Sequence, residues 1–136
     1  MKQLIVSARD SELGTILRFI EDELSAHDCP LKARMQLTLA AEEVFVNIAR
    51  YAFSGEDGEV ALSVSISSNP PLATLAFSDG GVPYNPLERP DPDVSLSAAE
   101  REIGGLGIYM VKRNVDEVRY RHENGRNVLT LIKTLR

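Results

Sequence analysis

An acid and an amide stand one helical turn apart in the segment from Leu37 to Phe53, whose pattern predicts a largely buried helix. Glu43 and Asn47 would lie about 40° apart around such a helix, so their side chains enter the same space. Because an unpaired buried charge is strongly unfavourable, both groups need partners. Glu43 could pair with Arg50 or lie at a solvated edge, and Asn47 could bond a neighbouring backbone group, or both could face a ligand and a metal ion. The apolar residues behind this prediction form a stripe at Leu37, Ala41, Val44, Ile48 and Tyr51, with Leu39, Phe45 and Val46 on the other sides.

A second polar candidate, Asp79, follows a predicted strand and precedes Gly80 and Gly81. Its carboxylate could accept a hydrogen bond in a cleft, and the glycines would let the backbone approach a ligand closely. Adenine offers an exocyclic amine to such an acceptor, whereas guanine presents a carbonyl at the same edge and would be disfavoured. The alternative is that Asp-Gly-Gly only makes a turn.

The third candidate is the run Gly104-Gly105-Leu106-Gly107 before a predicted helix. Glycine lets main-chain N–H groups reach an anion, and the helix dipole favours a phosphate there. The run fits neither the Walker pattern nor a dinucleotide fingerprint, and alone it is weak evidence. The order of all three features along the chain is more specific than any one of them.

The surrounding pattern predicts the elements that must position these residues. A long loop from Val82 to Ile103 contains a capping box at Ser97 to Glu100, which predicts a short helix, and Asn124-Gly125 predicts a tight hairpin. We expect an α+β fold in which helices cover one face of a mainly antiparallel sheet. The predicted elements are a strand over Lys2–Ala8, a helix from a cap at Asp10 or Ser11 to Ala26, a helix begun at Pro30, strands over Val60–Ser67 and Leu72–Phe77, a helix from Gly104–Gly107 to Val115, and strands over Glu117–His122 and Asn127–Thr134.

Composition limits the classes of function. The 136 residues, of which 43% are hydrophobic and 26% charged, predict a single globular domain over residues 1–136. The net charge of −5 argues against direct binding to nucleic acid or to an anionic membrane. A lone Cys29 excludes an internal disulfide, and the isolated His27 and His122 offer no zinc site. With no signal peptide and no membrane-length apolar run, we expect a cytoplasmic protein.

Three motifs in this order resemble those of the GHKL ATPase superfamily, and the short chain resembles its anti-sigma-factor serine kinase branch. Residues 41–47 (AEEVFVN) match the N box, residues 78–86 (SDGGVPYNP) the first glycine box, and residues 104–107 (GGLG) the second. The resemblance covers nearly the whole chain. It implies a Bergerat-type two-layer α/β sandwich, in agreement with the predicted elements.

The resemblance also implies a role for each candidate. Residues 87–106 would form an ATP lid, with Tyr84, Asn85 and Pro86 shaping its start and Arg101 either reaching the γ-phosphate or remaining a solvated charge. Pro83 stands where the superfamily often has another glycine, and the threonine often found near adenine corresponds to Asn127 or Thr130. The implied site is Asn47 for ATP and Mg²⁺, Glu43 as general base, Asp79 for adenine with Gly81 making room, and Gly104, Gly105, Leu106 and Gly107 for phosphate.

The main functional hypothesis is an ATP-dependent serine kinase that phosphorylates a STAS-type anti-anti-sigma partner and exchanges that partner for a sigma factor. The family also implies homodimerisation through the first strand and helix. An alternative is a nucleotide-gated protein-binding module without phosphotransfer. The catalytic domain of a sensor histidine kinase is disfavoured, because no phosphoacceptor-histidine helix precedes the predicted domain and His27 is poorly placed for that role.

Overall fold

The computed structural model describes residues 1–53, 56–88 and 105–135, which form one five-stranded sheet and three α-helices. The α+β fold class predicted from the sequence is confirmed. The α-helices are α1 (Leu13–Ala26), α2 (Leu31–Tyr51) and α3 (Gly105–Asn114), with short 3₁₀ turns at Asp10–Glu12 and Pro86–Glu88. The strands are β1 (Lys2–Ser7), β2 (Glu59–Ser68), β3 (Pro71–Asp79), β4 (Glu117–Glu123) and β5 (Arg126–Thr134).

The sheet has the order β1-β2-β3-β5-β4, and each neighbouring pair is antiparallel. Both predicted hairpins, β2–β3 and β4–β5, are confirmed, and the second turns through Asn124 (φ 54°) and Gly125 (φ 76°) as an Asn-Gly turn should. The pairing of β3 with β5 sets Asp79 directly opposite Asn127. Strand β3 runs through Asp79 and is thus longer than the predicted Leu72–Phe77.

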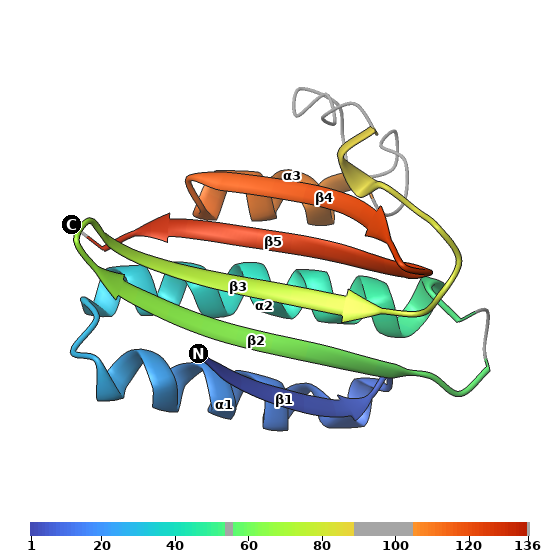
Figure 1. The fold of residues 1–136 in the computed structure, drawn as a ribbon, viewed down its shortest axis with the longest axis horizontal. Helices are drawn as coiled ribbons and strands as arrows, with labels where there is room; N and C mark the ends of the chain where they lie inside the picture. The colour runs from blue at the N-terminus through green and yellow to red at the C-terminus, as the bar shows by residue number, and fades with distance from the viewer. Residues whose placement is uncertain (54–55, 89–104, 136) are drawn as a thin grey trace.

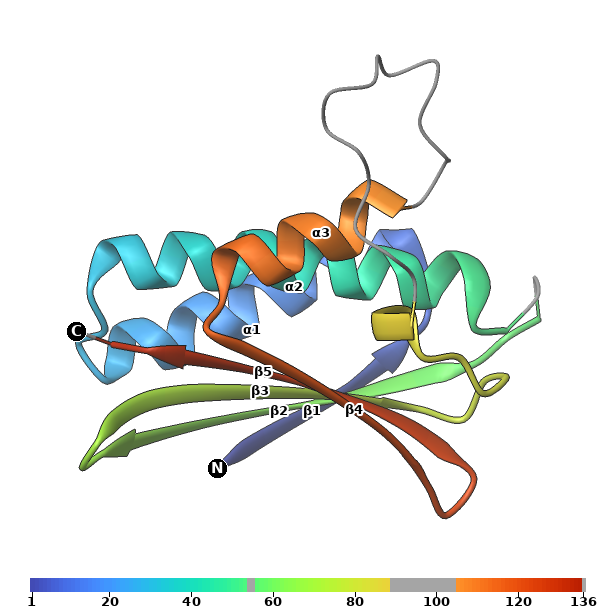
Figure 2. The ribbon, with the colours of Figure 1, turned by 90° about the horizontal axis from the view of Figure 1, so that it is seen from above.

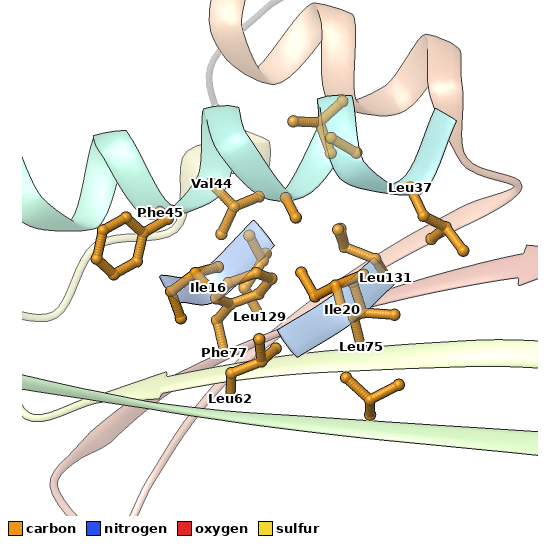
Figure 3. Packing of buried hydrophobic residues seen from close by; sticks show 14 of the residues in the cluster. Ile16, Ile20, Leu37, Val44, Phe45, Leu62, Leu75, Phe77, Leu129 and Leu131 are labelled. Carbon is orange, nitrogen blue, oxygen red and sulfur yellow. The ribbon is translucent and has the colours of Figure 1, made fainter. Parts of the chain in front are cut away.

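All three helices lie on one face of the sheet, with α2 between α1 and α3 (Figures 1 and 2). The core fills the space between the two layers, because every second residue along the strands points an apolar side chain toward the helices. Figure 3 shows its centre, where Ile16 and Ile20 of α1 and Leu37, Val44 and Phe45 of α2 meet Leu62, Leu75, Phe77, Leu129 and Leu131 of the sheet.

Helix α2 is less buried than its pattern predicted. Leu39 is 52% exposed and Tyr51 54% exposed, and Leu31 and Met35 are also exposed. An apolar stripe predicts which side chains can pack, but α2 has its partners on the sheet side and on its two flanks only. Its outer side therefore has no packing layer among the described residues.

The predicted cap of the first helix is wrong as well. Residues Asp10–Glu12 form a 3₁₀ turn, and α1 begins after Glu12 with no side-chain capping hydrogen bond. Pro30 is the N-cap residue of α2, one position before the first turn where it was expected. The predicted helix at Ser97–Glu100, Arg101 and Gly104 lie outside the described residues. No helix in the ranges 1–53, 56–88 and 105–135 is long and apolar enough to cross a membrane.

Candidate nucleotide-binding site

A cleft of about 560 Å³, counting its open mouth, lies between the C-terminal half of α2 and the adjoining ends of β3, β4 and β5. Helix α2 contributes Asn47 and Tyr51, and the sheet contributes Asp79 and Asn127. Other lining residues are Val82, Tyr84, Pro86 and Ile108. The lining is mainly apolar with a few convergent polar groups, which is the usual character of a small-molecule site.

Asp79 is buried in this cleft because of the strand period. It follows Ala73, Leu75 and Phe77 at every second position of β3, so the alternation that buries those side chains buries the carboxylate too. Asp79 is only 3% exposed. Its Oδ1 accepts hydrogen bonds from Gly81 N (2.9 Å) and from Asn127 Nδ2 (3.1 Å). Within the described part of the chain, no hydrogen bond reaches Oδ2, which leaves an acceptor for a ligand.

Gly81 is needed at the edge of the cleft because the backbone approaches α2 closely there. A Cβ on residue 81 would lie 2.3 Å from the carbonyl oxygen of Ala52, an overlap with backbone that only a shift of the chain could relieve. The next residue, Val82, donates its N–H to the same carbonyl at 3.0 Å. The glycine thus lets the strand end bond to the end of α2, and this contact closes one side of the cleft.

Glu43, Asn47 and Gly107 come together where α3 begins. A Cβ on residue 107 would lie 3.0 Å from Glu43 Oε2 and 3.5 Å from Asn47 Nδ2. Asn47 lines the cleft, whereas Glu43 lies one turn earlier, just beyond the described wall. The second glycine motif and the acid–amide pair, about 60 residues apart in the chain, are therefore neighbours.

Glu43 and Asn47 lack the structural partners that would have explained them otherwise. Both are half-buried, and no hydrogen bond or ion pair involves either one among the residues that the structure describes. Arg50 does not pair with Glu43 in the described residues, so the predicted ion pair between them is wrong, whereas the partial exposure of Glu43 fits the predicted solvated edge. The Glu43 carboxylate and the Asn47 carboxamide are therefore free to bind a ligand.

Helix α3 starts at Gly105, and its first turn lies beside this pair at Gly107. The first N–H groups of a helix have no partner within it, and the helix dipole makes this end favourable for an anion. Gly105 and Gly107 are consequently well placed for a phosphate, and Leu106 stands between them in the first turn.

The structure also identifies polar residues that the sequence left undecided or missed. Asn127 lies in the cleft opposite Asp79, whereas Thr130 pairs with Ala76 on the face without helices, so of the two candidates only Asn127 lines the cleft. Tyr120 was missed, although its alternation with Val118 along β4 marks it as facing the helices. Its hydroxyl donates to Asn127 Oδ1.

Two titratable groups with altered pKa values lie outside the cleft. The backbone N–H of Thr134, 2.6 Å away, lowers the pKa of Asp116, and the Thr134 hydroxyl adds a second hydrogen bond. Burial raises the pKa of the Cys29 thiol. Neither Asp116 nor Cys29 lines the cleft, so the polar chemistry of the cleft comes from the residues in its wall.

A sheet with helices on one face and a cleft between helix and strand ends defines a two-layer α+β domain with a small-molecule site, and comparison with known families identifies the class of protein. The model of the histidine kinase-like ATPase domain matches residues 6–133. The chain belongs to this family. Membership in an ATPase family identifies ATP as the nucleotide, as the sequence motifs predicted.

Among curated relatives, the chain is 27% identical over 100 residues to the serine/threonine-protein kinase BtrW of Bordetella bronchiseptica, covering 74% of this chain and 70% of that one. It is 29% identical over 98 residues to the serine-protein kinase RsbW of Listeria monocytogenes, covering 68% of this chain and 61% of that one. The chain thus spans about two thirds of the length of these relatives. The resemblance to the serine kinase branch that the motifs suggested is confirmed.

Two solved structures share the fold. The RsbU and RsbW domains of a Mycobacterium tuberculosis protein superpose with a TM-score of 0.66 at 15% identity, covering 99% of this chain and 33% of that one. The histidine kinase domain of a blue-light activated kinase from Erythrobacter litoralis gives a TM-score of 0.59 at 20% identity, covering 90% and 61%. They support the predicted Bergerat-type sandwich.

Proposed function

We propose that this chain is an ATP-dependent protein-serine kinase of the anti-sigma type, acting in the cytoplasm. The observation that carries the proposal is Glu43, a half-buried carboxylate without a partner in the described residues, set beside Asn47 and Gly107 at the start of α3. A module that only bound nucleotide would gain nothing from an unpaired acid there. The names of the two curated relatives support the same activity.

The chain's residues divide the work between the two ends of the cleft. At the sheet end, Asp79 accepts a hydrogen bond from the adenine amine. Gly81 has no side chain and therefore leaves room beside the base. At the helix end, the N–H groups at Gly105 to Gly107 hold phosphate, with Gly104 as the preceding residue of the motif. Residues 87–106 form the ATP lid in this proposal, because they connect the cleft wall at Pro86 to the start of α3.

Phosphotransfer needs a base for the serine proton. The serine Oγ attacks the γ-phosphorus in line, the bond from that phosphorus to the β-phosphate oxygen breaks, and ADP leaves. Glu43 takes the proton of the serine hydroxyl as the new phosphate ester forms. The N-terminal end of α3 favours the negative charge of both the phosphates and Glu43.

A magnesium ion fits this arrangement through Asn47. The carboxamide oxygen is a hard ligand, Asn47 makes no hydrogen bond within the described residues, and Mg²⁺ typically takes few protein ligands beside water and phosphate oxygens. When bound, the ion would supply neutralisation of phosphate charge. The described residues hold no cluster of three His, Cys, Asp or Glu side chains that could bind a metal ion by itself.

The substrate in this proposal is a serine on a STAS-type anti-anti-sigma protein, and the chain holds a sigma factor when that partner is phosphorylated. A homodimer through the β1–α1 region is part of the same proposal. The partner's unphosphorylated form would displace the sigma factor, so the output is an exchange of partners. The identity of both partners rests on the family resemblance alone.

The test is transfer of labelled γ-phosphate from Mg·ATP to the STAS protein encoded nearest to this chain, with ATP affinity measured in parallel. Glu43→Gln should lower the transfer rate by about 10²- to 10⁴-fold, the usual contribution of a general base, while ATP affinity changes less than about threefold. Glu42→Gln is the matched control, since Glu42 is also half-buried and is the adjacent residue on α2, and it should transfer at the wild-type rate.

The outcomes separate the hypotheses. Tight ATP binding without transfer to any STAS partner would favour the nucleotide-gated binding module. Equal loss in both variants would contradict a specific role for Glu43. An absence of ATP binding by the wild-type protein would contradict the assignment of the cleft.

A further inference from the structure

Asn127 uses its whole hydrogen-bonding capacity inside the cleft. It is 6% exposed, and its Nδ2 donates to Asp79 Oδ1 (3.1 Å), to the carbonyl of Val82 (2.9 Å) and, at 3.5 Å, to that of Gly81. Its Oδ1 accepts from the Tyr84 N–H (3.2 Å) and from the Tyr120 hydroxyl. A carboxamide has two N–H donors and one oxygen with two lone pairs, so little capacity remains.

The backbone contacts fix which way this carboxamide points. The Tyr84 N–H can only donate and the Val82 carbonyl can only accept, so the Asn127 oxygen must face Tyr84 and its nitrogen must face Val82. The nitrogen therefore also presents a donor to Asp79. Neither end can be exchanged without leaving buried groups unpaired.

This orientation determines which oxygen of Asp79 a ligand meets. Oδ1 is held from one side by Asn127 Nδ2 and from the other by Gly81 N, and these are its only hydrogen bonds in the described part of the chain. Oδ2 is left as the acceptor for a base. A hydroxyl residue at position 127 would have a single donor and could hold either Asp79 or the Val82 carbonyl, but not both.

The same side chain fixes the segment that leaves the cleft toward Pro86. Val82 and Tyr84 lie 45 and 43 residues before Asn127 in the chain, yet both bond to it through their backbones. Their own side chains are 54% and 46% exposed, so packing alone does not hold this segment. One buried amide therefore supports both the base-reading acid and the cleft wall beside it.

We propose that Asn127 is a positioning residue that sets the base preference of the cleft and also anchors residues 82–84. The proposal rests on ATP binding in this cleft, which is part of the proposed function. Asn127 acts through Asp79 and through the backbone and does not need to touch the base itself. A Thr or Ser at this position would separate the two roles.

Two measurements test the proposal, and a purely structural role would not move the first. The first is the ratio of the dissociation constants of purine riboside triphosphate, which lacks the 6-amino group, and ATP. Asn127→Ala should lower this ratio about tenfold, because Asp79 is no longer aligned with the amine, whereas a general loss of structure would weaken both ligands equally. The second is the amide exchange rate of Tyr84 without nucleotide, which should rise about tenfold.

Thr130→Ala is the matched control, since it removes a hydroxyl from β5 on the face away from the cleft, and it should leave both measurements unchanged. If Asn127→Ala does not fold, Asn127→Thr replaces it, and at least one of the two measurements should change about tenfold because one hydroxyl cannot supply both donors. An unchanged ratio and unchanged exchange in the folded variant would overturn the proposal. Failure of the wild-type protein to bind ATP would instead overturn the proposed function.

Discussion

The two ends of the cleft are built in opposite ways. At the sheet end, Asp79 and Asn127 are almost fully buried and are held by hydrogen bonds to each other and to backbone. At the helix end, Glu43 and Asn47 are half-buried and bond to nothing in the described residues. Both ends carry one acid and one amide, so the difference lies in their surroundings and not in their chemistry.

The comparison indicates which parts of the cleft are organised before a ligand arrives. A buried polar pair with satisfied hydrogen bonds can keep one geometry, which suits the reading of a base. A carboxylate and a carboxamide without partners can both bind a ligand. The carboxylate can also accept the proton that a reacting hydroxyl releases. In the proposed function, the sheet end would confer selectivity and the helix end would provide the chemistry.

The largest effect on the difference between the two ends is expected when Asp79, the acid at the sheet end, is replaced by an amide. In Asp79→Asn, the side-chain oxygen should keep the bonds from Gly81 and Asn127, and the new NH₂ should face the ligand. ATP affinity should fall about 100-fold, because the charged hydrogen bond is lost and the new NH₂ group faces the adenine amine, which is also a donor. Titration with ATP and with inosine triphosphate, whose 6-oxo group is an acceptor, should show an inverted preference.

Asp57→Asn is the matched control for that change, because Asp57 is an exposed acid that pairs with Arg9 and does not line the cleft. It should bind ATP like the wild-type protein. Retention of the ATP preference in Asp79→Asn would show that another residue reads the base.

A methyl group at Gly81 should act on the fold. The added Cβ would overlap the Ala52 carbonyl, which belongs to the backbone and cannot swing away. Gly81→Ala should therefore lower the free energy of unfolding by about 2 kcal/mol, as measured by urea denaturation. Gly14→Ala, where a Cβ would meet nothing within 4 Å, should not destabilise the protein and serves as the control.

The same methyl group at Gly107 should act on the site alone. Its Cβ would meet the flexible ends of Glu43 and Asn47, which can move, and alanine favours a helix more than glycine does. We expect the free energy of unfolding to change by no more than about 1 kcal/mol, in the stabilising direction. ATP affinity should fall about tenfold as the space beside the phosphates fills. A loss of stability as large as that of Gly81→Ala would contradict the distinction between the two ends.

The smallest change in stability should come from replacing the unpaired acid with an apolar residue. Glu43→Met removes a half-buried carboxylate without a partner and should raise the free energy of unfolding by about 0.5–1 kcal/mol in the absence of nucleotide, while abolishing transfer. Glu23→Met is the contrast, since Glu23 is 13% exposed and pairs with Lys2 at 3.2 Å, and its loss should destabilise. Denaturation of both variants in one buffer measures the difference.

The sequence was sufficient for the elements and for the helix-end pair, because both depend on local spacing. Apolar side chains at every second position of residues 60–67 predict a strand. Glu43 and Asn47 are one helical turn apart, so they lie side by side on α2 whatever the helix packs against. That these two meet Gly107 followed from the family resemblance and not from spacing.

The sheet end was only partly predictable, because its contacts join distant parts of the chain. Asp79 and Asn127 are 48 residues apart, and only the register of β3 on β5 decides between Asn127 and Thr130. Exposure of Tyr51 was missed for a related reason, since a helical stripe does not reveal whether a neighbouring layer covers it. Instead, Tyr51 lines the mouth of the cleft.

The strand order has a consequence for how the protein folds. The hairpins β2–β3 and β4–β5 close over short turns, whereas β3 meets β5 only after the chain has passed through α3. Closing such a long connection costs more entropy than closing a hairpin turn, and contacts of this kind slow folding. Asp79 belongs to one hairpin and Asn127 to the other, so neither hairpin alone contains this hydrogen-bonded pair. The sheet end of the cleft is therefore complete only when the two hairpins have docked.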